Sequence, residues 1–178
     1  MRDRLLTGSG FLLRPWLEAD AGAVLDAFTP PEMARQTGRA IREQPDALLW
    51  VREREAERAA GTDFSWAVVD GEGTLLGCVA VGSVDRRHDT GWVSYWTVAA
   101  ARGRGVAGAG ARAVADWAFQ DLGLFRLELG HRTNNPASCR VATGAGFAVE
   151  GLERSKLRYG TARYDVELHA RLATDPPH

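Results

Sequence analysis

The feature of this 178-residue chain that most restricts its fold is a glycine-rich stretch from Val98 to Val114, VAAARGRGVAGAGARAV. Gly103 and Gly105 allow the backbone to turn tightly and to approach a ligand without obstruction by a side chain. Apolar and small residues follow at helical spacing, so we expect a helix to begin directly after the loop. The free N–H groups of its first turn and the positive end of its dipole form an anion site. The loop therefore predicts a bound pyrophosphate.

The loop matches two phosphate-binding patterns. Residues 103–108 fit G-x-G-x-x-G, the dinucleotide-binding fingerprint, and the acidic Glu128 follows at about the 20-residue spacing that this fingerprint requires. Shifted by one residue, 102–107 read R-x-x-G-x-A, with Arg102 and Arg104 available to contact phosphate oxygens. The first pattern needs repeated βαβ units around the loop, whereas the preceding sequence predicts a hairpin meander. The second pattern fits this context better.

Hydrophobic periodicity predicts a mixed α/β fold, with strands and helices along the whole chain. Three strands joined by short turns form an antiparallel meander before the loop, because parallel neighbours need a long crossover. The expected strands are 11–16, 64–69, 74–84, 91–98 and 124–130, with a final antiparallel pair within 147–172. The expected helices are 17–28, 46–61, 106–118 and a short one that starts after Asn135 and ends near Gly144 or Gly146. We expect residues 1–178 to form one domain.

Charge and cysteine usage exclude several classes of partner. The formal net charge is −1, which gives no electrostatic reason to expect nucleic acid or an anionic membrane surface. Cys78 and Cys139 show neither metal-ligand spacing nor a disulfide framework, and Cys78 is expected to be a small buried residue in an apolar strand. No apolar run approaches membrane-spanning length, and the N-terminus lacks the apolar core of a signal peptide. We expect a cytoplasmic protein without a metal.

The stretch from Tyr95 to Gly151 resembles the Gcn5-related N-acetyltransferase (GNAT) superfamily, particularly the subgroup of ribosomal-protein N-terminal acetyltransferases. Residues 12–28 and 159–172 resemble the subgroup's opening strand and helix and its closing segment. The resemblance covers most of the chain and implies a central, mostly antiparallel sheet flanked by helices. It implies acetyl-CoA, or a larger acyl-CoA, as the acyl donor and a primary amine of a protein N-terminus or small molecule as the acceptor. A homodimer is a further expectation from it.

Two motifs carry the expected site residues. In such proteins an R-x-x-G-x-G/A loop binds the pyrophosphate of acetyl-CoA, and the strand leading into it pairs with the pantetheine arm. A Pro common three residues before the loop arginine is Ala99 here, which loosens the turn without removing a ligand contact. The second motif, N-x-x-S followed by Gly-Phe, falls on Asn135, Ser138 and 146–147. The residues that the resemblance assigns to CoA binding are Trp96, Thr97, Val98, Arg102, Gly103, Arg104, Gly105, Val106, Ala107, Asn135 and Ser138.

The same resemblance suggests roles in catalysis. Acyl transfer to an amine needs a neutral amine, a stabilised oxyanion and a thiolate that can leave. Backbone N–H groups near Thr97 and Val98 are candidates for oxyanion stabilisation. Ser138 can hydrogen-bond or reprotonate the departing CoA thiolate. Asn135 would lie near the pantetheine arm, although an Asn before Pro is also a good helix N-cap, and both roles can coexist.

The general base is not evident from the sequence. Some relatives have a Glu after the Gly-Phe pair, in the segment where this chain has Lys156. The remaining candidates are Glu128, His131 and Tyr95. Direct attack with water-mediated deprotonation of the amine is the hypothesis that we prefer.

Other functions remain to be distinguished. A non-catalytic CoA-binding or CoA-sensing protein would keep both CoA motifs, so the sequence does not separate it from an enzyme. An NAD-linked enzyme is the alternative from the first glycine pattern. RNA binding through the RGRG segment is disfavoured, because such segments are repeated and disordered. Hydrolases are disfavoured by the absence of their motifs from the sequence.

Overall fold

The computed structural model describes residues 2–176, with the backbone alone for residues 34 and 35. In chain order its elements are β1 (Leu5–Leu6), β2 (Leu12–Arg14), the 3-10 turn η1 (Glu18–Asp20), α1 (Ala21–Phe28), η2 (Pro31–Gln36), α2 (Gln44–Ala60), β3 (Phe64–Val69), β4 (Leu75–Asp85), β5 (Thr90–Thr97), η3 (Ala99–Ala101), α3 (Val106–Gln120), β6 (Arg126–Arg132), α4 (Pro136–Gly144), β7 (Ala148–Tyr159) and β8 (Ala162–Leu172). Within the described residues, eight strands form one sheet in the order β1-β2-β3-β4-β5-β6-β8-β7. The predicted mixed α/β class and mostly antiparallel sheet are confirmed.

Local sequence signals explain most element boundaries. Gly61 ends α2 in a left-handed conformation, with φ 72°. The strand expected at 124–130 begins two residues later, because the Leu124 N–H bonds to Ala118 O at the end of α3 and is not part of the ladder. The two-residue strand β1, which pairs with β2, is not signalled by the sequence.

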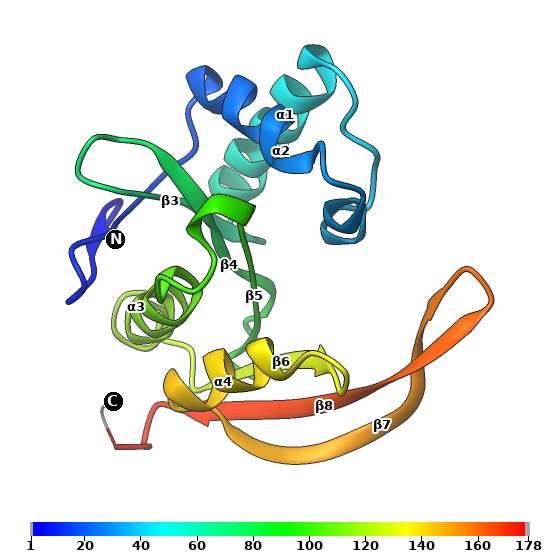
Figure 1. Cartoon of the computed structure of the whole chain (residues 1–178). Helices are drawn as coiled ribbons and strands as arrows, with labels where there is room; N and C mark the ends of the chain where they lie inside the picture. The colour runs from blue at the N-terminus through cyan, green and yellow to red at the C-terminus, as the bar shows by residue number, and fades with distance from the viewer. Residues whose placement is uncertain (1, 177–178) are drawn as a thin grey trace.

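Helices cover both faces of the twisted sheet, and strand residues alternate between them (Figure 1). In β3, Phe64, Trp66 and Val68 join the core beneath α3 and α4. Ala67 and Val69 join the other core, beneath α1 and α2. None of the helices in the described part of the chain combines the length and apolarity needed to cross a membrane.

The sheet opens between β5 and β6, the fifth and sixth strands in its order. β5 and β6 run parallel and pair at only three positions, from Thr90 with Arg126 to Trp92 with Glu128. Beyond Trp92 the two strands diverge, so the β5 edge from Val93 to Thr97 has no strand partner on that side among the described residues. The long β7–β8 hairpin then projects from the body next to this opening (Figure 1).

Candidate active site

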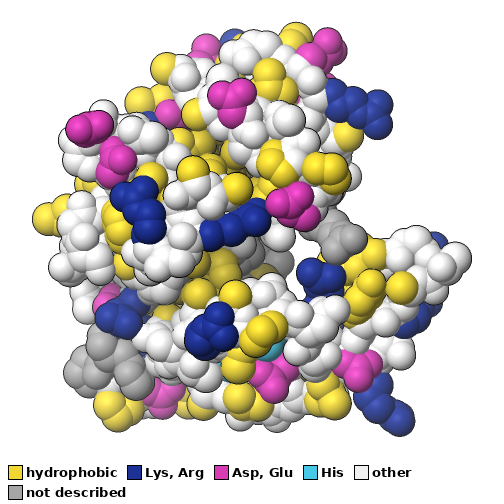
Figure 2. Space-filling model, in the orientation of Figure 1, with side chains coloured by type: hydrophobic (Ala, Val, Ile, Leu, Met, Phe, Trp, Pro, Cys, Tyr) yellow, Lys and Arg dark blue, Asp and Glu magenta, His cyan; other side chains and the backbone are white. Residues whose placement is uncertain are grey.

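A cleft of about 850 Å³ occupies the opening between β5 and β6. It is lined by η2, β5, the start of α3, the end of β6, the start of α4 and the β7–β8 hairpin. Figure 2 shows the molecule hollowed on this side, with dark blue basic side chains at the rim. Arg102, Arg132 and Arg140 belong to the lining. The volume suits a ligand of the size of a nucleotide cofactor, and the basic lining suits an anionic one.

The glycine loop delivers the start of α3 to this cleft. Gly103 and Gly105 have φ values of 77° and 79°, a left-handed conformation that favours glycine. Gly105 is the N-cap, and the first bond within the helix runs from Ala109 N to Gly105 O at 3.0 Å. The N–H groups of residues 106–108 therefore have no partner within the helix, and all three residues line the cleft. This geometry is an anion site.

Arg102 reaches across the mouth of the cleft. Its guanidinium nitrogen Nη1 lies 3.4 Å from Glu32 Oε1 on η2, and both side chains are about half exposed. Such an exposed pair is weak, so an anionic ligand at the start of α3 can compete with Glu32 for the arginine.

The edge of β5 offers alternate residues to the cleft. The Val98 N–H donates to Leu76 O at 3.0 Å, and the Trp96 carbonyl also faces β4, against Gly77. Because backbone groups of successive strand residues point to opposite sides, those of Tyr95 and Thr97 face the opening. The expectation that the Val98 N–H is free to stabilise an oxyanion is therefore corrected, since that group is already bonded within the sheet. The Trp96 ring packs in the core against Trp16, Phe28 and Trp50.

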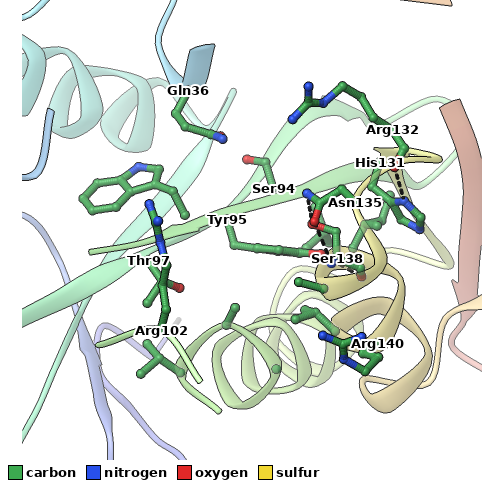
Figure 3. A pocket seen from close by; sticks show the side chains of 18 of the residues that line it. Gln36, Ser94, Tyr95, Thr97, Arg102, His131, Arg132, Asn135, Ser138 and Arg140 are labelled. Atoms are coloured by element: carbon green, nitrogen blue, oxygen red, sulfur yellow. Dashed lines mark hydrogen bonds between the residues drawn. The ribbon is translucent and has the colours of Figure 1, made fainter. Parts of the chain in front are cut away.

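Asn135 and Ser138 form a reciprocal pair at the start of α4 (Figure 3). The Asn135 side-chain oxygen accepts the Ser138 N–H at 3.3 Å, which confirms the predicted N-cap. The Asn135 amide nitrogen donates to Ser138 Oγ at 3.0 Å, so the serine hydroxyl proton remains available for another acceptor. The Tyr95 hydroxyl donates to the Ser138 carbonyl at 3.2 Å. Burial raises the pKa of Tyr95 above its ordinary value, which keeps the phenol protonated.

Most of the expected site residues line the cleft, and three of them do not. The cleft lining includes Trp96, Thr97, Arg102, Gly103, Gly105, Val106, Ala107, Asn135 and Ser138. Val98, Arg104 and Glu128 are not among its lining residues. The Glu128 carboxylate instead pairs with Arg126 at 2.8 Å. A strand position alone does not show which face a carboxylate occupies, and here Glu128 lies outside the cleft lining, paired with Arg126.

Neither of the other two candidates for the base offers the cleft a free basic atom. His131 lines the cleft, but its Nδ1 faces the Arg132 carbonyl and its Nε2 faces His169. The Tyr95 hydroxyl is a protonated donor, as described above.

Several lining residues were missed by sequence reasoning, namely Gln36, Ser94, Arg132, Arg140, Leu157 and Tyr159. Arg132 and Arg140 flank the N-x-x-S motif, which was the available signal for them. Leu157 and Tyr159 come from the distant β7–β8 hairpin, and no local pattern in the sequence connects them with the loop.

Comparisons with known proteins agree with this geometry. A family model described as "Acetyltransferase (GNAT) domain" matches residues 11–148. A Bacillus subtilis (strain 168) protein named "Probable N-acetyltransferase YjcK" is 32% identical over 102 residues, 57% of this chain and 56% of that protein. The "Ribosomal-protein-serine acetyltransferase" of Escherichia coli (strain K12) is 28% identical over 101 residues, 57% of this chain and 56% of that protein. The matched stretch thus spans about half the length of these curated relatives.

A solved structure extends the likeness in fold to nearly the whole chain. "Mycobacterium smegmatis RimJ in complex with CoA-disulfide" has a TM-score of 0.85 and 24% identity, and the superposition covers 98% of this chain and 88% of that one. At this identity the likeness concerns the fold.

Proposed function

The chain belongs to the acetyltransferase (GNAT) family, and from this premise we propose that it transfers an acetyl group from acetyl-CoA to a primary amine within a ternary complex. One observation carries the proposal. A single cleft joins the anion site at the start of α3, the unpaired edge of β5 and the Ser138 hydroxyl at the start of α4. These three groups, in this order along the cleft, suit the phosphates, the pantetheine amides and the thioester of acetyl-CoA.

The donor would bind along the cleft through backbone groups. Its pyrophosphate would accept hydrogen bonds from the N–H groups of residues 106–108, with Arg102 as an additional charge partner. The amides of its pantetheine arm would pair with the backbone of Tyr95 and Thr97, in the place of a missing strand. The thioester would then lie near Ser138 at the start of α4.

The chemical step follows from these contacts. The amine nitrogen attacks the thioester carbonyl carbon, a C–N bond forms and the C–S bond breaks. A backbone N–H of β5 that faces the opening and is left unpaired by the pantetheine amides is the candidate donor to the oxygen on which negative charge develops. Because Ser138 Oγ accepts its hydrogen bond from Asn135, its own proton can point at the departing sulfur. The attacking amine loses its proton through water, since Glu128, His131 and Tyr95 offer no free basic atom to the cleft.

The acceptor is proposed to be the α-amine of a protein N-terminus or the amine of a small molecule. The name of the E. coli relative, which specifies a serine of a ribosomal protein, supports the first. We further propose that residues 1–178 act as one catalytic domain in the cytoplasm. A homodimer is proposed through β7, an edge strand on which Val149 and Leu152 are more than half exposed.

A thiol-release assay with acetyl-CoA tests this function. The panel would contain peptides with N-terminal serine or alanine, polyamines and aminoglycosides, with N-blocked peptides as matched controls. We expect amine-dependent release of CoA and a product heavier by one acetyl group. CoA binding without release for any amine would favour a non-catalytic CoA-binding protein. Thermal stabilisation by NAD but not by CoA would overturn the assignment of the cleft.

A further inference from the structure

Four metal-ligating side chains meet beneath α4, behind the wall of the cleft. They are His131 on β6, Cys139 on α4, and Glu167 and His169 on β8. One ligand atom from each lies within 4.8 Å of those from the other three. His169 and His131 are almost completely buried, while Cys139 and Glu167 are partly exposed. The acetyl-transfer mechanism assigns no role to this cluster.

The distances within the cluster are close to the edges of a metal tetrahedron for two pairs of atoms and shorter for two others. The two Nε2 atoms are 2.9 Å apart, and Glu167 Oε1 lies 3.0 Å from His169 Nε2 and 3.3 Å from His131 Nε2. Cys139 Sγ lies 3.5 Å from the same carboxylate oxygen. Zinc bonds to nitrogen, oxygen and sulfur at tetrahedral angles give edges of about 3.3–3.6 Å. Binding one ion needs shifts of a few tenths of an ångström between the histidines and Glu167, and a larger approach of Cys139 Sγ to the histidine nitrogens, which lie up to 4.8 Å away.

The outer nitrogens of both rings are oriented as in metal-bound histidines. His131 Nδ1 lies 3.0 Å from the Arg132 carbonyl oxygen, and His169 Nδ1 lies 3.4 Å from the Phe147 carbonyl oxygen. With the proton of each ring on Nδ1, donated to that carbonyl, both Nε2 atoms are free to ligate a metal. Metal-ligating histidines typically have this outer hydrogen bond.

The two Nε2 atoms and the Glu167 carboxylate oxygen converge around one point in a largely buried setting. Either a proton shared among these groups or a metal cation between them would satisfy all three. A bound metal would also displace the thiol proton of Cys139.

We propose that His131, Cys139, Glu167 and His169 form a zinc site that fastens the first turns of α4 to β6 and β8. The mixed nitrogen, sulfur and oxygen ligand set suits zinc, and four protein ligands leave no open position for a substrate. The site is therefore structural. Because Cys139 directly follows Ser138, the ion would also fix the helical turn that presents the serine to the cleft. This proposal does not rest on the proposed acetyl transfer.

Zinc binding is measured first on the unaltered chain, prepared without a polyhistidine tag. The protein is stripped with a chelator, dialysed and titrated with zinc against a chromophoric competitor. We expect one zinc per chain and a higher thermal midpoint, because an ion that binds only the folded state stabilises it. Cobalt in place of zinc should give the visible bands of a tetrahedral site and a thiolate-to-cobalt charge-transfer band.

Paired variants identify the ligands. Cys139→Ser should abolish the charge-transfer band, whereas Cys78→Ala, which alters the other cysteine, should retain it. His131→Gln should lose stoichiometric zinc binding, whereas His88→Gln, at an exposed turn, should keep it. Absence of stoichiometric binding by the unaltered chain would overturn the proposal and leave a shared proton between the two histidines as the explanation of the cluster. Zinc binding that survives in both Cys139→Ser and His131→Gln would overturn it equally.

Discussion

At the level of single side chains, the hydrogen bonds between Asn135 and Ser138 decide where the serine proton can point. Asn135 uses both ends of its amide on one partner, accepting from the Ser138 N–H and donating to Ser138 Oγ. The cap of α4 and the orientation of the hydroxyl are thus produced by the same residue. A helix cap and a positioning residue for catalysis need not be alternatives.

Replacement of Ser138 by alanine tests the role of its proton. Ser138→Ala should lower kcat by about 100-fold or more, the usual contribution of a proton donor in the transition state, with little change in the KM for acetyl-CoA. Thr143→Ala removes a hydroxyl from the same helix outside the cleft and is the matched control. Steady-state kinetics with both variants give the comparison. An unchanged kcat in Ser138→Ala would show that water protonates the sulfur.

Two carboxylates of η1 provide a second test, this time of stability. Asp20 pairs bidentately with Arg14, with both distances 2.7 Å and both side chains largely buried, whereas Glu18 pairs with the exposed Arg52. Asp20→Ala leaves a mostly buried arginine without its partner and should lower the unfolding free energy by about 2–4 kcal/mol. Glu18→Ala should change it much less, because exposed pairs contribute little. Urea denaturation of both variants checks the difference, and equal losses would contradict it.

At the level of elements, the left-handed glycine at the start of α3 couples backbone conformation to ligand binding. Gly105 and Gly73 both have positive φ, 79° and 85°, and an added Cβ meets no atom within 4 Å at either position. Alanine at either position should therefore cost a similar strain, about 1–2 kcal/mol. Gly105→Ala should also weaken CoA binding at least about tenfold, because relief of the strain turns the N–H groups away from the ligand. Calorimetric titration of both variants tests this, and similar CoA affinities would contradict it.

Elements with strong local signals could be predicted from the sequence. The β3–β4 turn has Asp70 and glycines, α2 ends at Gly61, and α4 starts after Asn135-Pro136, all through side-chain or φ requirements readable within a few residues. The start of β6 was misjudged because a tertiary bond from Leu124 to the end of α3 competes with strand pairing. The direction of the Val98 N–H depends on register with β4, which periodicity does not give.

At the level of the whole molecule, the pair between Arg102 and Glu32 lies at the mouth of the cleft and joins segments 70 residues apart. Glu32→Gln should release Arg102 for phosphate and tighten CoA binding by up to about fivefold, the scale of an exposed ion pair. The gain should shrink at high salt, where screening already weakens the pair. Binding isotherms at two salt concentrations, with Glu72→Gln in the distant β3–β4 turn as control, decide it. Weaker binding would indicate that Glu32 contributes to the ligand site.

The parts of the site that join distant segments could not be predicted from the sequence. The two motifs pointed to the glycine loop and to Ser138, which both line the cleft, because each motif is short and readable along the chain. The hairpin wall with Leu157 and Tyr159, and the cluster of His131, Cys139, Glu167 and His169, arise only when β6, α4, β7 and β8 come together. No spacing rule marks four ligands that are distributed over three elements.

The three-pair junction between β5 and β6 has a mechanical consequence. It divides the sheet into two parts, β1 to β5 and β6-β8-β7, which are joined by this short strand pairing and by the helices packed across it. A donor molecule that pairs with the free edge of β5 would bridge the two parts of the sheet along the rest of their boundary. CoA must leave this position after each transfer, so the ease with which the two parts separate would help to set the rate of CoA release.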